Sequence, residues 1–133
     1  MKYQQRDFDG ELKEKIKRTE RVLNDNIERF AAEQASVFEK RDLDFEARFD
    51  QEGEDRFTPG YSSSLSIGIA EKGGELIDLH VIKIWKCDRS ILGMPISKNV
   101  PGSKVTGEYL DESIEEVKEE LRRYVKESLL NEH

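Results

Sequence analysis

The chain contains one cysteine, one tryptophan, two histidines and three prolines in 133 residues. A single cysteine excludes a disulfide within the chain and favours a reducing compartment. No apolar run approaches the roughly 20 residues of a membrane-spanning helix. The N-terminal residues lack the hydrophobic segment of a secretion signal. The sequence therefore predicts a cytoplasmic protein that does not enter a membrane.

Apolar residues are also scarce, at 35%, whereas 38% of the residues are charged and the net charge is −7. Regular apolar spacing nevertheless argues against disorder, and the length is typical of a single domain, residues 1–133. The negative charge is concentrated, because seven carboxylates stand against two arginines between residues 42 and 61. Nucleic acid is disfavoured as a ligand, since neutralising phosphates requires a basic surface. A basic protein partner suits the charge.

Two segments have the spacing of amphipathic helices. From about residue 10 to residue 38, apolar residues recur at steps of three, four and seven, beginning with Leu12. This helix is longer than a small domain needs and offers a surface for homodimerisation, unless it breaks at the weak helix formers Asn24–Asn26. The second helix starts after Ser113, which forms a capping box with Glu116.

Three segments predict β-strands: residues 42–50, 64–70 and 76–86. Gly73 and Gly74 indicate a hairpin between the last two. The following segment, 88–110, reads as a long irregular loop with room for one short strand. The expected fold is a two-layer α+β domain. In it, the N-terminal and C-terminal helices cover an antiparallel sheet of three to four strands, in the order helix, three strands, loop, helix.

The rare residues gather in one predicted strand. Asp78 and His80 lie two apart and share a face, so they form a polar pair able to orient an imidazole as a general base. Trp85 is expected on the opposite face, unless a bulge near Val81–Ile82 switches the facing. Cys87 lies too far along the strand to act with His80. Two histidines do not complete a metal site, so neither metal nor cofactor is expected.

The acidic strand and the long loop are the best candidates for a binding surface. Carboxylates on alternate strand positions share one face, and a surface of one charge sign steers an oppositely charged partner. The predicted partner-binding residues are Asp42, Asp44, Glu46, Asp50, Glu52, Glu54, Asp55, Lys98 and Tyr109.

These features favour a non-enzymatic module that binds a basic protein. By charge and size alone it is comparable to immunity proteins and antitoxins that inhibit basic toxins. Two alternatives remain. One is a small enzyme with its site between the Asp78/His80 face and the 88–110 loop. The other is a dimeric scaffold that associates through the N-terminal helix.

Overall fold

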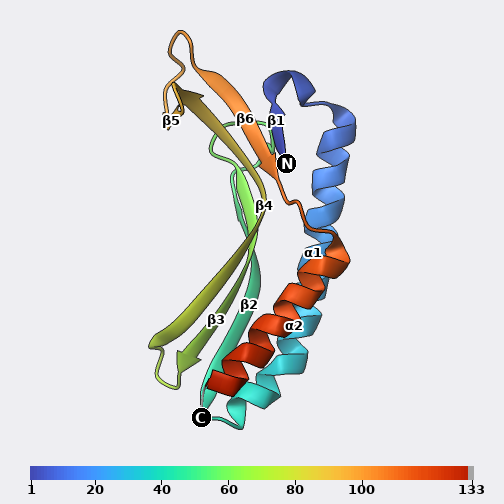
Figure 1. Cartoon of the computed structure of the whole chain (residues 1–133), viewed down its shortest axis with the longest axis vertical. Coiled ribbons are helices and arrows are strands. Elements are labelled where there is room, and N and C mark those ends of the chain that lie inside the picture. The colour runs from blue at the N-terminus through green and yellow to red at the C-terminus, as the bar shows by residue number, and fades with distance from the viewer. Residues whose placement is uncertain (132–133) are drawn as a thin grey trace.

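The computed structural model describes residues 1–131 and shows an antiparallel sheet with both helices on one face (Figure 1). The elements are β1 (Lys2–Gln4), a 3-10 turn (Gln5–Asp7), α1 (Gly10–Glu39), β2 (Leu43–Glu52), β3 (Ser62–Glu71), β4 (Leu76–Ile91), β5 (Met94–Pro95), β6 (Lys104–Tyr109) and α2 (Ile114–Asn131). The sheet order is β1-β6-β4-β3-β2, and β5 pairs with the end of β4. The α+β class is confirmed, but the sheet has six strands rather than three or four.

About half of the 88–110 segment is sheet. Its first residues complete β4, Leu92 and Gly93 turn the chain into β5, and β6 returns beside β4 and pairs Lys104 with Ser90. Leu92 and Gly93 both have positive φ, of 51° and 79°, which is the backbone of the tight turns that suit twisted strands. The segment therefore forms a projecting hairpin (Figure 1).

Helix α1 is continuous. Its N-cap Asp9 accepts a hydrogen bond from the Leu12 backbone N–H at 2.8 Å, and the Asn26 side chain donates to the Val22 carbonyl inside the helix. The apolar stripe of α1 packs on the sheet, and Val37 is its one large apolar side chain that is exposed. Most of the apolar surface of α1 is therefore used in packing on the sheet, and homodimerisation through this helix stays a prediction.

Strand β4 contains two bulges that decide which of its side chains face the helices. Asp78 and Leu76 pair with consecutive residues of β3, as do Trp85 and Lys83, so Ile77 and Ile84 are extra residues. A bulge of this kind shifts the side chains beyond it to the other face. Ile84 and Trp85 are consequently both fully buried, and the expectation that Trp85 lies opposite His80 was wrong. The bulge lies at Ile84, not at Val81–Ile82.

Strand β4 also changes partners along its length. Residues 76–83 pair with β3 alone and residues 87–90 pair with β6, and only Trp85 and Lys86 pair with both strands. The sheet bends at this change, and its concave side faces away from the helices (Figure 1). We call this solvent-facing side the open face.

The core lies between the sheet and the helices and contains one buried ionic network. Leu23 and Ile27 of α1, Ile67 of β3 and Val117 of α2 are among its fully buried members. Beside them Glu20, only 3% exposed, accepts hydrogen bonds from Arg56 at 2.8 and 2.5 Å and from the Tyr61 hydroxyl at 2.6 Å. This network ties the loop after β2 to α1.

Candidate functional site

The acidic residues of β2 lie on the open face. Asp44 and Glu46 are exposed opposite Ala70 and Gly68 of β3, and no ion pair involves either carboxylate within the described chain. Asp50 differs, because Arg48 lies 3.0 Å from it and the Ser66 hydroxyl donates to it. The unneutralised charge on the open face of β2 is therefore that of Asp44 and Glu46.

The other predicted binding residues do not join this row. Asp42 lies in the turn before β2, with a φ of 61°. Tyr109 is buried and its hydroxyl bonds the Thr19 hydroxyl. Lys98 lies in the hairpin loop between β5 and β6. Glu52 ends β2, and Glu54 lies in the loop after it.

Asp55, also in that loop, has a structural role. It accepts a hydrogen bond from the Phe57 backbone N–H at 3.0 Å. That bond, together with one from the Thr58 side chain, lowers the pKa of Asp55. Its carboxylate therefore organises the loop from within.

The Asp78/His80 pair belongs to a polar cluster with α2. His80 Nε2 lies 2.6 Å from Glu120 Oε2, and its ring stacks on Tyr124 with centroids 4.9 Å apart. Tyr124 in turn donates to Asp78 at 2.8 Å. Burial and then the hydrogen bond to Glu120 raise the pKa of Glu112. Burial opposes ionisation of Glu120 too, but hydrogen bonds from His80 and Glu112 outweigh it and lower the pKa of Glu120.

A cavity of about 420 Å³ adjoins this cluster where β6 gives way to α2. Glu112 and Glu120 line it from one side and Lys83 from another. Glu108, Tyr109 and Leu110, at the end of the 88–110 segment, also line this cavity, whereas the hairpin tip projects from the far end of β4 (Figure 1). The cluster of His80 and Glu120 thus adjoins a cavity that the end of that segment helps to line.

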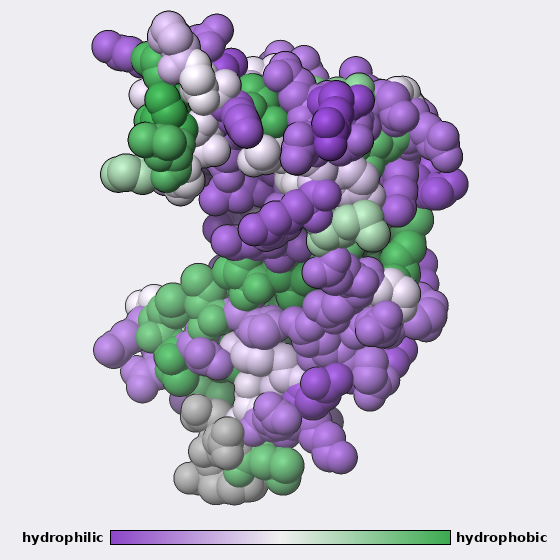
Figure 2. All heavy atoms as spheres, turned by 45° about the horizontal axis from the view of Figure 1, so that its top comes forward, coloured by the Kyte–Doolittle hydropathy of each residue, from purple (hydrophilic) through white to green (hydrophobic). Residues whose placement is uncertain are grey.

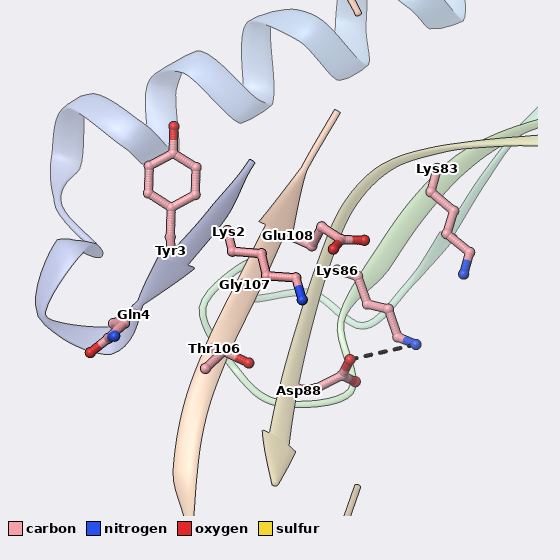
Figure 3. A pocket seen from close by; sticks show the side chains of 9 residues that line it. All are labelled: Lys2, Tyr3, Gln4, Lys83, Lys86, Asp88, Thr106, Gly107 and Glu108. Atoms are coloured by element: carbon pink, nitrogen blue, oxygen red, sulfur yellow. Dashed lines mark ion pairs between the residues drawn. The ribbon is translucent and has the colours of Figure 1, made fainter. Parts of the chain in front are cut away.

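A second cavity, of about 430 Å³, lies on the open face where β1, β6 and β4 meet (Figure 3). The amines of Lys2, Lys83 and Lys86 point toward it, together with the carboxylates of Asp88 and Glu108. Lys86 is 3.5 Å from Asp88. The opposed charges partly balance, so this cavity has no strong preference for one sign of ligand.

Cys87 is fully buried on the helix side of β4. Burial, with a smaller contribution from Asp88, raises the pKa of its thiol to about 11. Such a thiol is protonated and shielded at neutral pH, which is the opposite of a catalytic cysteine.

Exposed apolar residues mark the two ends of the open face. Leu76, Leu79 and Val81 of β4 are 57%, 54% and 46% exposed. Leu92 and Met94 at the hairpin tip are 97% and 68% exposed. Figure 2 shows a hollow in this side of the molecule with apolar surface on both of its lips. Residue alternation does not predict this arrangement, because it does not reveal which face of the sheet the helices leave bare.

Comparison of the chain with protein-family models, with curated proteins and with solved structures found no match. No described helix is long and apolar enough to cross a lipid bilayer. Among residues 1–131 no group of three or more histidine, cysteine or acidic side chains is arranged to hold a metal ion. Functional inference therefore rests on the surface features described above.

Proposed function

We propose that the chain is a non-enzymatic protein-binding module whose open face receives a basic protein partner. The observation that carries the proposal is the bare concave face of the sheet, which has exposed apolar residues at both ends and an unneutralised acidic row along β2. By charge and size, an inhibitor of the immunity or antitoxin type is a suitable example of such a module.

The distribution of exposed apolar side chains supports a protein as the ligand. Ten large apolar residues are exposed in the described chain; four belong to residues 76–81 of β4 and three to the hairpin of residues 92–100. Scattered exposed apolar residues are ordinary, but apolar side chains grouped on one side, with polar residues around them, mark protein interfaces. Surfaces of that kind form the desolvated centre of a complex.

The charge on β2 supports a basic partner. Between the apolar row of β4 and the carboxylates of β2 lie the small side chains of β3, including Ser66 and Gly68. Neighbouring strands are ~4.8 Å apart, so Asp44 and Glu46 lie about 10 Å from the apolar row, across β3. A partner seated on the open face would meet both an apolar strip and a pair of free carboxylates.

Charge reversal on β2 tests this arrangement. The Asp44→Lys/Glu46→Lys double variant should bind a natural partner roughly tenfold more weakly or worse, because like charges across an interface are costly. The matched control is Asp25→Lys/Glu28→Lys, which makes the same charge change on exposed positions of α1, in the other layer.

The partner is identified by mass spectrometry of proteins retained from native extract, and its affinity for each variant is measured by calorimetry. We expect a basic protein whose affinity falls with the β2 variant and not with the α1 control. Equal affinity for wild type and the β2 variant, or equal losses in both variants, would contradict the proposal.

A substitution at the hairpin tip provides a second test of the proposal without destabilising the fold. Leu92 has a positive φ, which asparagine tolerates better than leucine. Leu92→Asn should therefore maintain or increase stability while removing the exposed apolar tip. We expect weaker partner binding with an unchanged or higher urea midpoint; unchanged binding would remove the hairpin from the interface.

The cluster around His80 favours a second candidate function, a small enzyme. Two carboxyl groups whose pKa values are displaced in opposite directions, beside an imidazole and a cavity, are an arrangement that supports acid–base chemistry. Chromogenic esters, phosphates and glycosides would be assayed with wild type and with His80→Ala and Glu120→Gln. Turnover above that of both variants would favour the enzyme; equal rates would count against it.

A further inference from the structure

We infer that two copies of this chain associate edge to edge through residues 75–83 of β4 and the turn before it, pairing antiparallel about a two-fold axis at Leu79. This inference goes beyond the proposed function, because it concerns the sheet edge and a second copy of the chain rather than the open face and a foreign partner.

None of the described strands lies beside this edge of β4. Residues 76–83 pair with β3 on one side, and β6 begins to pair with β4 only at Trp85. A strand edge presents unpaired backbone N–H and C=O groups and is a template for another strand. Ile77, Leu79 and Val81 on this edge are 40%, 54% and 46% exposed, so apolar contacts would accompany the backbone hydrogen bonds.

The two outer strands of the sheet, β2 and β1, are less suited to pairing with another chain. β2 carries charged residues at every second position from Asp44 to Asp50, and charges on an edge discourage pairing with another chain. β1 has only three residues, too few for a stable ladder. Residues 76–83 instead form eight positions with three ionisable side chains: Asp78, His80 and Lys83.

Residues 75–83 of one copy are complementary to residues 75–83 of a second copy when the two strands pair antiparallel. In an antiparallel pair centred on Leu79, Leu79 faces its own copy, Ile77 faces Val81, and Asp78 faces His80. At the ends Glu75 faces Lys83, and the long lysine side chain spans the displacement caused by the bulge at Ile77. Opposite charges across strands stabilise a sheet and like charges destabilise it.

Neighbouring registers lack this complementarity. Centring the pair on Asp78 places two aspartates opposite each other, and centring it on His80 does the same for two histidines and leaves Lys83 opposite Ile77. A two-fold interface requires a surface that matches itself, and the register centred on Leu79 places Glu75 opposite Lys83 and no like charges opposite each other. Side chains keep their faces in such a pairing, so the two open faces would form one continuous surface.

Disulfide trapping tests the register. In Leu79→Cys the two new thiols face each other on the axis, whereas in Val81→Cys they are four residues out of step, about 13 Å apart along the strands. Buried Cys87 remains in both variants and in the wild-type control. Under mild oxidation we expect rapid dimer formation by Leu79→Cys alone. Equal rates in both variants, or faster trapping of Val81→Cys, would overturn the inference.

Charge exchange tests the same interface without cysteine. Lys83→Glu places two glutamates together at each end of the pair and should raise the dimer dissociation constant about tenfold, since each end changes from attraction to repulsion. The double variant Glu75→Lys/Lys83→Glu should restore it. Lys104→Glu on β6 is the matched control and should leave it unchanged.

Masses are measured by light scattering and sedimentation over a wide concentration range, and far-ultraviolet circular dichroism checks the fold. A wild-type monomer throughout, or failure of the double variant to recover, would refute the edge pairing. The apolar row of β4 belongs to both proposals, but the proposed function is tested separately through Asp44, Glu46 and Leu92, which do not take part in this interface.

Discussion

Gly107 provides the sharpest test of how β4 and β6 pack. A Cβ built on Gly107 would lie 2.0 Å from Trp85 Cη2 and 2.5 Å from Trp85 Cζ2, far inside van der Waals contact. Trp85 has no room to yield, because it is fully buried and its indole N–H donates to the Arg56 carbonyl at 2.7 Å. Gly107→Ala must therefore move either the indole or strand β6.

The cost follows from two contributions. Overpacking a filled core costs about 1–3 kcal/mol, and losing the indole hydrogen bond adds about 1 kcal/mol. We therefore expect the free energy of unfolding to fall by about 3 kcal/mol. With a urea m-value of about 1.5 kcal/mol per molar for a small protein, the midpoint should fall by about 2 M.

The assay is urea unfolding followed by fluorescence of the single tryptophan and by circular dichroism. Gly68→Ala is the matched control: it is also a glycine within a strand, but its new Cβ meets Leu76 Cδ1 at an ordinary 3.5 Å. Its midpoint should change little. If Gly107→Ala unfolds at the wild-type midpoint, the close packing of Trp85 against β6 is refuted. A smaller effect of Gly107→Ala in a Trp85→Phe background would assign the cost to the indole.

Three further predictions concern buried or titrating groups. Glu20→Ala leaves the Arg56 guanidinium and the Tyr61 hydroxyl without their buried acceptor and should lower the free energy of unfolding by about 3–5 kcal/mol; a loss below 1 kcal/mol in a urea titration would show that water replaces the carboxylate. Cys87 should resist thiol reagents at pH 8 until the chain unfolds, so a labelling rate independent of urea would contradict its burial. Because folding raises the pKa of Glu112, its contribution to stability is present below its ordinary value of 4.5 and is lost as pH rises through the folded value. Glu112→Gln should therefore stabilise the chain at pH 7 and lose that advantage near pH 4, and an equal change in urea midpoint at both pH values would contradict this assignment.

Local patterns determined most of the elements. The apolar stripe beginning at Leu12 predicts α1, and the capping box of Ser113 and Glu116 is present at the start of α2 with reciprocal hydrogen bonds of 3.2 and 3.1 Å. The Gly73–Gly74 hairpin also follows from sequence, since both residues have the positive φ that glycine permits. These features depend on neighbours in the chain, and such interactions are legible in a single sequence.

Tertiary structure decided what the surface presents. The bulges at Ile77 and Ile84 arise from pairing with β3 and turn Trp85 inward, which simple alternation does not predict. The 88–110 segment became a hairpin through pairing of β6 with β4, a contact between residues distant in sequence. The sequence by itself determined the helices, the acidic strand and the helix-facing residues of β3. Long-range packing decides which sheet face stays bare, which edge of β4 stays unpaired and which residue His80 contacts. Each of these is a relation between elements, and no local sequence pattern encodes it.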